Sequence, residues 1–209
     1  MISHVNHLKV EIVLVVEKLF KKIILIIISM SINLIMGCMF SGKTSALINV
    51  AKISKMINRK VLLINYIEDT RYSSSGNITT HDSISIECIP CGKDITVILN
   101  TQDYIDSEVI CINEGQFFDN LVHFCKTACN EGKEVHVCGL DGDYLKCPFG
   151  ELLNLIPHCD DVKKLKALCM SCKNGTLASF TKRIGDSKVL IEIGSTEMYI
   201  PVCRKCYNK

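Results

Sequence analysis

The residues 37–44, Gly-Cys-Met-Phe-Ser-Gly-Lys-Thr, form a glycine loop that ends in a lysine and a hydroxyl side chain. An apolar run, 32–36, precedes this loop, and apolar residues at helical spacing follow it. A strand, a glycine loop and a helix in this order are the context that a phosphate-binding P-loop requires. Gly37 and Gly42 would let backbone N–H groups face a phosphate, and the helix N-terminus adds a favourable dipole. Lys43 would contact the β and γ phosphates, and Thr44 would offer its hydroxyl to Mg²⁺.

Two Cys-x-x-Cys pairs near the C-terminus indicate a metal site. They are Cys169 with Cys172 and Cys203 with Cys206. Each pair can present two thiolates to one Zn²⁺, and two pairs complete a closed tetrahedral site. The segment between the pairs is longer than a minimal zinc ribbon needs, which suggests that it does more than bind metal.

Glu114 follows an apolar run that reads as a strand, 109–112. In a P-loop enzyme the second acidic motif lies at the end of such a strand, across the sheet edge from the lysine. A carboxylate there can take a proton from an attacking hydroxyl or water. The alternative interpretation is a surface glutamate at a strand end.

The elements that must position these residues follow an alternating pattern. Strand-like runs at 32–36, 61–65, 108–113 and 134–140 alternate with helical stretches, one of which we place at 117–130 because Leu121, Phe124, Cys125 and Ala128 share a face. This alternation predicts an α/β fold, a P-loop NTPase-like parallel sheet with helices on both faces. We expect it to span residues 30–164, and a small zinc-ribbon domain to span 165–209.

Composition limits the classes of protein that the chain can represent. Its 209 residues suffice for one core with a small appendage, and a net charge of +2 argues against electrostatic recruitment of nucleic acid. Thirteen cysteines, an odd number without a regular framework, favour a reducing compartment such as the cytoplasm over a secreted disulfide scaffold. A third pair, Cys88 and Cys91, has redox spacing without a redox context, and we interpret it as coincidence.

Residues 1–29 leave three interpretations open. The segment is strongly apolar, but charges interrupt it, and its longest unbroken run, 23–28, is too short to span a membrane. It is an amphipathic helix packed on the domain, a membrane-surface or targeting segment, or a dispensable extension upstream of Met30.

Taken together, these motifs resemble the zinc-containing, P-loop type of the thymidine kinase family, in particular its short viral members. The resemblance runs from about Met30 to the C-terminus. Besides the P-loop it rests on further matching segments: Asp69-Thr70-Arg71-Tyr72, Glu114-Gly115-Gln116-Phe117-Phe118, Leu140-Asp141-Gly142, Pro148-Phe149 and Val202-Cys203-Arg204-Lys205-Cys206-Tyr207.

The resemblance implies transfer of the γ-phosphate of ATP to the 5′-hydroxyl of thymidine, with Mg²⁺ and structural Zn²⁺, in DNA precursor salvage. It implies that Glu114 is the general base and that Lys43 and Arg71 are catalytic. The implied ATP and Mg²⁺ site comprises Gly37, Cys38, Met39, Phe40, Ser41, Gly42, Lys43, Thr44, Asp69, Asn113 and Gln116. The implied thymidine site comprises Met39, Phe117, Leu140, Tyr144, Thr181, Leu190, Ile191, Glu192, Ile193, Gly194 and Tyr199. Residues 190–194 belong to the family's lasso, a loop between the zinc knuckles that closes over the base. The family also implies a homotetramer, whereas the charge and the short apolar runs lead us to expect no specific nucleic-acid partner and no membrane span.

Two departures from the family pattern concern the site. Asn113 stands where the family usually has Asp, so we expect weaker use of Mg²⁺ or compensation by Asp69 or Glu114, and an Asp there should leave activity equal or raise it. Tyr144 stands where the family has Phe, and its hydroxyl needs a partner or a place at the pocket rim.

Two other functions remain as alternatives. A nucleic-acid-dependent NTPase with a zinc ribbon is disfavoured by the near-neutral charge and the lack of tryptophan. A non-catalytic nucleotide-binding relative is favoured by Asn113 and disfavoured by the intact Lys43, Thr44, Glu114 and Arg71.

Overall fold

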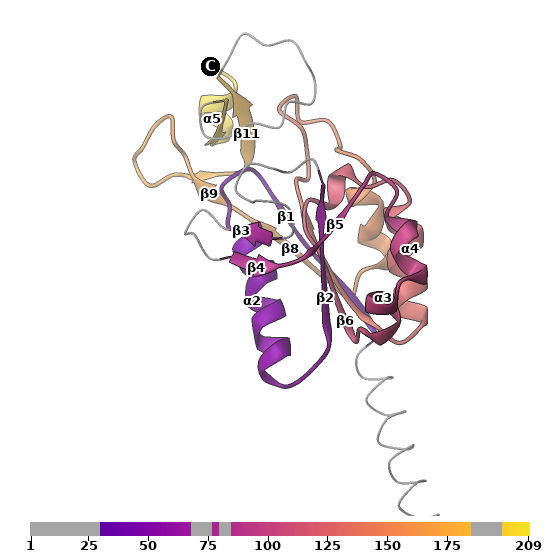
Figure 1. Ribbon diagram of the computed structural model, residues 1–209. Helices are drawn as coiled ribbons and strands as arrows, with labels where there is room; N and C mark the ends of the chain where they lie inside the picture. Colours follow the sequence, from indigo (N-terminus) through magenta and orange to yellow (C-terminus); the bar gives the residue numbers. More distant parts are fainter. Residues whose placement is uncertain (1–29, 68–76, 80–84, 185–197) are drawn as a thin grey trace, which may run out of the picture.

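A computed structural model describes residues 30–67, 77–79, 85–184 and 198–209 (Figure 1). The expectations for residues 1–29, for Asp69 and Arg71, and for the lasso residues 190–194 lie outside the described residues.

A parallel sheet forms the centre of the molecule, with strand order β5-β2-β6-β7-β1-β8. Every neighbouring pair in it runs parallel. The strands are β1 (Ser31–Gly37), β2 (Val61–Tyr66), β5 (Ile89–Cys91), β6 (Val109–Ile112), β7 (Glu134–Gly139) and β8 (Asp161–Leu165). The predicted α/β class is therefore confirmed, and the phosphate loop follows β1 at the carboxyl edge of the sheet, where ligands bind in such folds.

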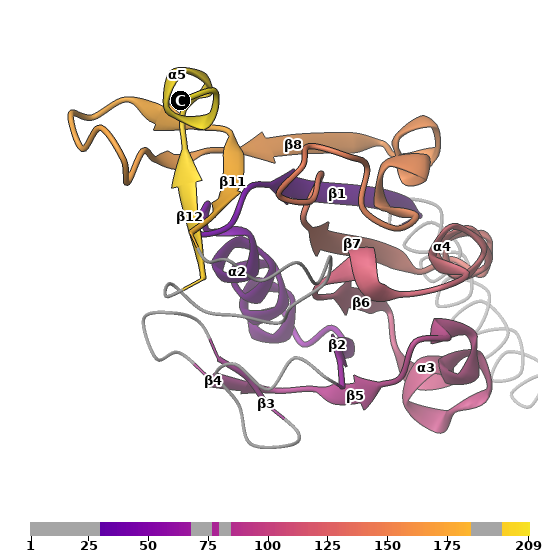
Figure 2. The same ribbon diagram turned by 90° about the horizontal axis from the view of Figure 1, so that it is seen from above.

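The sheet carries a separate apolar core on each face, because its central strands are buried on both sides. Helix α2 (Lys43–Met56) covers one face, where Val109 and Cys111 are buried. Ile110 and Ile112 point into the other core, beneath α4 (Leu121–Asn130) and the short helices η1 (Ile95–Asn100), α3 (Gln102–Asp106) and η3 (Leu152–His158) (Figure 2). A two-stranded hairpin, β3 (Asn77–Thr79) with β4 (Ser85–Glu87), adds to the α2 side.

The predicted helix 117–130 begins later than expected, and that boundary was wrong. Residues Gly115–Phe117 form the short 3-10 helix η2, and α4 begins at Leu121. The Glu151 carboxylate accepts hydrogen bonds from the backbone N–H groups of Asn120 at 3.1 Å and Val122 at 3.2 Å. These bonds satisfy the free donors at the helix start, and the cap comes from a residue that no local pattern reveals.

The third cysteine pair lies at the edge strand β5. Cys88 is buried in the α2-side core and Cys91 in the opposite core, so the two thiols face different sides of the sheet. They therefore form no redox pair, as the sequence interpretation held.

The C-terminal segment forms two small antiparallel pairs, β9 (Ala167–Leu168) with β10 (Leu177–Ala178) and β11 (Phe180–Arg183) with β12 (Tyr199–Val202), followed by α5 (Arg204–Tyr207). Its buried residues share one cluster with Cys38 of the phosphate loop. The Cys38 thiol donates a hydrogen bond to the Ala178 carbonyl at 3.5 Å. This candidate zinc module, residues 167–184 and 198–207 of the described chain, therefore packs directly on the predicted phosphate loop.

All thirteen cysteines are free thiols. No helix in the described ranges is long and apolar enough to cross a membrane.

Candidate nucleotide site and metal centre

The phosphate loop makes its turn between β1 and α2. Gly42, which precedes the helix, has a left-handed φ of 83°. Gly37 sits so close to β8 that a Cβ there would lie 2.4 Å from the Leu165 carbonyl oxygen. The buried Lys43 ammonium donates to the Cys38 carbonyl at 2.8 Å, and the Ser41 hydroxyl donates to the same oxygen. The predicted loop residues thus form one closed turn that begins a helix.

One hydrogen bond joins this loop to the second predicted motif. The Thr44 hydroxyl donates to Asn113 Oδ1 at 3.2 Å, and Asn113 directly follows β6 and is 2% exposed. A hydroxyl and an amide oxygen are hard donors of the kind that Mg²⁺ prefers, so the pair fits a magnesium–nucleotide complex. Neither group brings a negative charge, which a carboxylate or the phosphates themselves must supply.

Glu114, next to Asn113, has an unusual backbone conformation. Its φ of 54° lies in the left-handed region, which costs a non-glycine residue about 1–3 kcal/mol. The buried Gln116 amide donates to the Glu114 carboxylate and accepts from the Leu140 N–H at 3.0 Å. Gln116, expected at the ATP and Mg²⁺ site, therefore has its side chain directed at Glu114 and Leu140.

An aromatic wall stands beside Glu114. The Phe117 ring stacks on Tyr66, with centroids 5.0 Å apart, and meets the edge of Phe149 at 5.3 Å. Sequence reasoning placed Phe117 in the site but missed the two rings that fix it. Tyr66 ends strand β2, and an aromatic residue at the carboxyl end of a parallel strand was the signal that could have pointed to it.

The remaining predicted substrate residues gather in two groups. The Met39 N–H donates to the Thr181 hydroxyl at 3.1 Å, which ties the phosphate loop to β11. Arg183 joins the other two, because its guanidinium carbon lies 4.2 Å from the Tyr144 ring centroid and 5.1 Å from that of Tyr199. It also donates to the Tyr199 hydroxyl. Sequence reasoning missed Arg183, which holds these two rings together.

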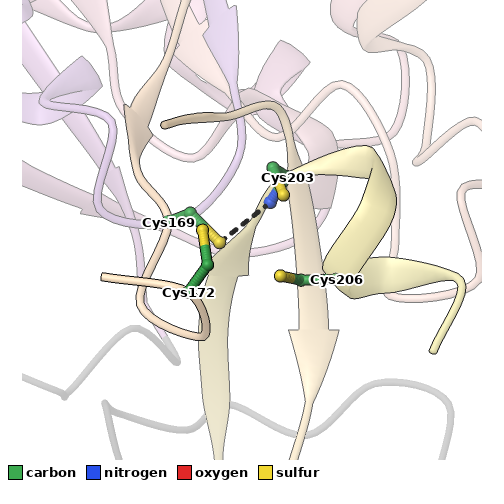
Figure 3. Close-up of side chains that lie close together, drawn as sticks. All are labelled: Cys169, Cys172, Cys203 and Cys206. Carbon is green, nitrogen blue, oxygen red and sulfur yellow. Dashed lines mark hydrogen bonds between the residues drawn. The ribbon is translucent and has the colours of Figure 1, made fainter. Parts of the chain in front are cut away.

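The four cysteines of the two pairs come together in the zinc module. Cys169 and Cys172 lie in the turn after β9, and Cys203 and Cys206 lie at α5 (Figure 3). Their sulfur atoms all lie within 4.8 Å of one another. In a tetrahedral zinc site with bonds of about 2.3 Å, the sulfurs are about 3.8 Å apart, so a small contraction accommodates the ion.

Backbone groups prepare this centre for a cation. The N–H of Cys172 and the N–H of Cys203, the latter 3.3 Å from the Cys169 sulfur, lower the pKa of the Cys169 thiol to about 6. A thiolate is the form that binds zinc. The donor set and its surroundings therefore fit a structural Zn²⁺.

Comparisons with known proteins agree with this geometry. The family model described as thymidine kinase matches residues 30–207. The chain is 43% identical to the thymidine kinase of Yaba monkey tumor virus over 178 residues, 85% of this chain and 94% of that protein. It is 42% identical to the human cytosolic thymidine kinase over 180 residues, 85% of this chain and 73% of the human one. It is also 42% identical to the thymidine kinase of vaccinia virus strain Western Reserve, over 84% of this chain and 96% of the viral protein.

Proposed function

The chain belongs to the thymidine kinase family, and we propose that it transfers the γ-phosphate of ATP to the 5′-hydroxyl of thymidine for DNA precursor salvage. The observation that carries the proposal is the hydrogen bond from Thr44 to Asn113. Glu114 is the next residue at the same edge of the sheet, which supports its proposed role beside the loop that would hold the phosphates. A general base next to a phosphate-binding loop is an arrangement that supports in-line phosphoryl transfer.

Each residue has a role that its position supports. The Glu114 carboxylate accepts the proton of the 5′-hydroxyl as the oxygen attacks the γ-phosphorus, and Gln116 holds that carboxylate. Lys43 and the loop amides bind the phosphates, and Arg71, with Asp69, completes the site as the family pattern implies. Thr44 would hold Mg²⁺ through its hydroxyl oxygen while Asn113 accepts the hydroxyl proton, and the ion would neutralise phosphate charge.

The thymine base lies against the wall around Phe117, with Met39, Leu140 and Thr181 near its methyl group. Tyr144 and Tyr199 border the pocket, and the family pattern implies that the lasso, residues 190–194, would cover it. Zn²⁺ on the four cysteines fixes both ends of that lid, which gives the long interval between the pairs its purpose. The stacked rings Phe117 and Tyr66 support a flat, aromatic substrate.

Assembly and location follow from the resemblance. We infer a homotetramer, which light scattering of the purified protein tests. We infer the cytoplasm, which is supported by thirteen free thiols and by the cytosolic human relative.

The direct test offers thymidine, deoxyuridine, deoxycytidine and deoxyguanosine in parallel to purified protein with ATP and Mg²⁺. We expect phosphorylation of thymidine, weaker phosphorylation of deoxyuridine and negligible reaction of the other two. A reaction without nucleoside measures ATP hydrolysis alone. Protein that holds zinc and binds ATP, yet phosphorylates none of the four, would contradict the proposal.

A further inference from the structure

A buried polar residue with no assigned role lies beside Asn113, the residue that accepts a hydrogen bond from Thr44. Asn65, near the end of β2, is 6% exposed. The register of β2 against β6 pairs Ile64 with Ile112, so the next residues, Asn65 and Asn113, are neighbours. The Asn113 Nδ2 group donates to Asn65 Oδ1 at 2.8 Å. A buried amide in a strand needs such a partner, because an unsatisfied polar group there is costly.

The contacts of Asn113 determine which end of its amide faces the phosphate loop. Its Oδ1 accepts from the Thr44 hydroxyl at 3.2 Å and from the Cys138 thiol at 3.1 Å, while its Nδ2 faces Asn65. In this orientation Thr44 gives its single proton to Asn113, and its oxygen lone pairs are left for a cation. With the amide reversed, an NH₂ group would donate to Thr44 and place partial positive charge beside the cation.

We propose that Asn65 is a positioning residue for the magnesium–nucleotide complex, because it fixes the Asn113 amide with its oxygen toward Thr44. The inference rests on the proposed function, which places Mg²⁺ at the Thr44 hydroxyl that Asn113 orients. It also assigns a purpose to the neutral Asn113. A pair of amides holds the Thr44 hydroxyl without burying a charge, which would be expensive at this depth.

The test measures how strongly Mg²⁺ helps ADP to bind. The dissociation constant of ADP is measured by calorimetry with excess Mg²⁺ and with EDTA, and the ratio of the two is the magnesium coupling. The ratio is the dissociation constant in EDTA divided by that in Mg²⁺. A general loss of structure raises both dissociation constants, whereas a misdirected Thr44 hydroxyl lowers their ratio. For Asn65→Leu we expect the ratio to fall by about fivefold, the scale of one net hydrogen bond.

Two matched variants sharpen the comparison. Asn65→Asp offers oxygen acceptors only, so it still holds the Asn113 NH₂ group, and because its negative charge also attracts a cation it should keep or raise the wild-type ratio. Asn33→Leu removes an amide from β1, where Asn33 bonds Ser31 at the opposite end of the sheet, and should also keep it. A wild-type ratio in Asn65→Leu, or an equal loss in Asn65→Asp, overturns the inference.

A second pair of variants applies if Asn65→Leu does not fold. Asn65→Lys alone sets two donors against each other and should lose the coupling. Adding Asn113→Asp gives the lysine a carboxylate partner and should restore both the coupling and the melting temperature. Additive losses would overturn the inference. If the wild-type protein phosphorylates thymidine but the Asn65 variants keep its magnesium coupling, the role of Asn65 alone is refuted. If the wild-type protein shows neither magnesium coupling nor phosphate transfer, the proposed function is refuted as well.

Discussion

Replacing Gly139 by alanine tests whether Gln116 holds the carboxylate of Glu114, the proposed general base, in place. Gly139 is the last residue of β7, and a Cβ added there would lie 2.4 Å from Gln116 Oε1 and 3.0 Å from a Leu152 methyl carbon. Ordinary contacts begin at 3.4 Å, so the Gln116 amide must retreat by about 1 Å. Gln116 is 3% exposed and Leu152 fully buried, so neither has solvent to move into.

That movement disturbs two hydrogen bonds at once, one from the Leu140 N–H and one to Glu114. Each contributes about 0.5–1.5 kcal/mol to stability. The larger effect is on the rate, since a misplacement of about 1 Å in a catalytic group costs on the order of a hundredfold. We expect kcat for thymidine to fall by about ten- to a hundredfold, while the dissociation constant of ADP changes by less than about twofold, because the phosphate loop is untouched.

Steady-state kinetics and ADP calorimetry measure these two quantities. Gly92→Ala is the matched control, because a Cβ at Gly92 meets no atom within 4 Å. Gln116→Ala should lower kcat in the same way, and adding Gly139→Ala to it should cost little more, because both act through one contact. Wild-type kcat in Gly139→Ala, or independent losses in the double variant, would refute the idea that Gln116 positions Glu114.

Three further predictions concern the base, the metal and pH. Glu114→Gln should lower kcat by at least about a hundredfold and leave ADP binding intact, and retained turnover would exclude the base assignment. Cys203→Ser should lose zinc by elemental analysis, lower the melting temperature and raise KM for thymidine more than KM for ATP; Cys147→Ser, an exposed thiol outside the cluster, should do none of these. The hydrogen bond from His136 lowers the pKa of Glu134 from its ordinary 4.5 to about 2, so this carboxylate adds stability that is complete above about pH 4.5 and lost as the pH falls toward 2. Urea unfolding should show a loss of at most about 3 kcal/mol over that range, and Glu134→Gln should show a correspondingly smaller loss.

The sequence predicted the central strands well because their residues are apolar on both faces. Strand β6 is buried at every position, and a short continuous apolar run of this kind is typical of a strand in a parallel sheet that is covered on both faces. Strand β8 was not predicted, since residues 161–164 are all exposed and all but Val162 are charged, as an edge strand permits. Its assignment depends on backbone pairing with β1, which no local pattern encodes.

Within the candidate site, the sequence pointed to residues by their charge or cysteine spacing and missed those that orient them. Lys43 and the four cysteines stand out by type and spacing. Asn65 and Arg183 do not, because a lone amide in a strand or a lone arginine near the end of one reads as a solvent-exposed side chain. Their importance arises from contacts across strands, Asn65 to Asn113 and Arg183 to Tyr199. Residues that orient other side chains can be recognised only in the folded structure, where the strands lie side by side.

The carboxyl edge of the sheet is therefore built from buried amides around a few charges. Asn65, Asn113 and Gln116 are each at most 6% exposed, and each directs its amide at another residue of the site. A neutral amide offers a donor and an acceptor at once, so it can fix the direction of a neighbour without adding a charge that burial would penalise. Lys43 and Glu114 carry charges that the proposed phosphoryl transfer would use at this edge. Reliance on linked amides also makes this edge of the sheet sensitive to single substitutions, because reversing one amide disturbs both of its hydrogen-bond partners.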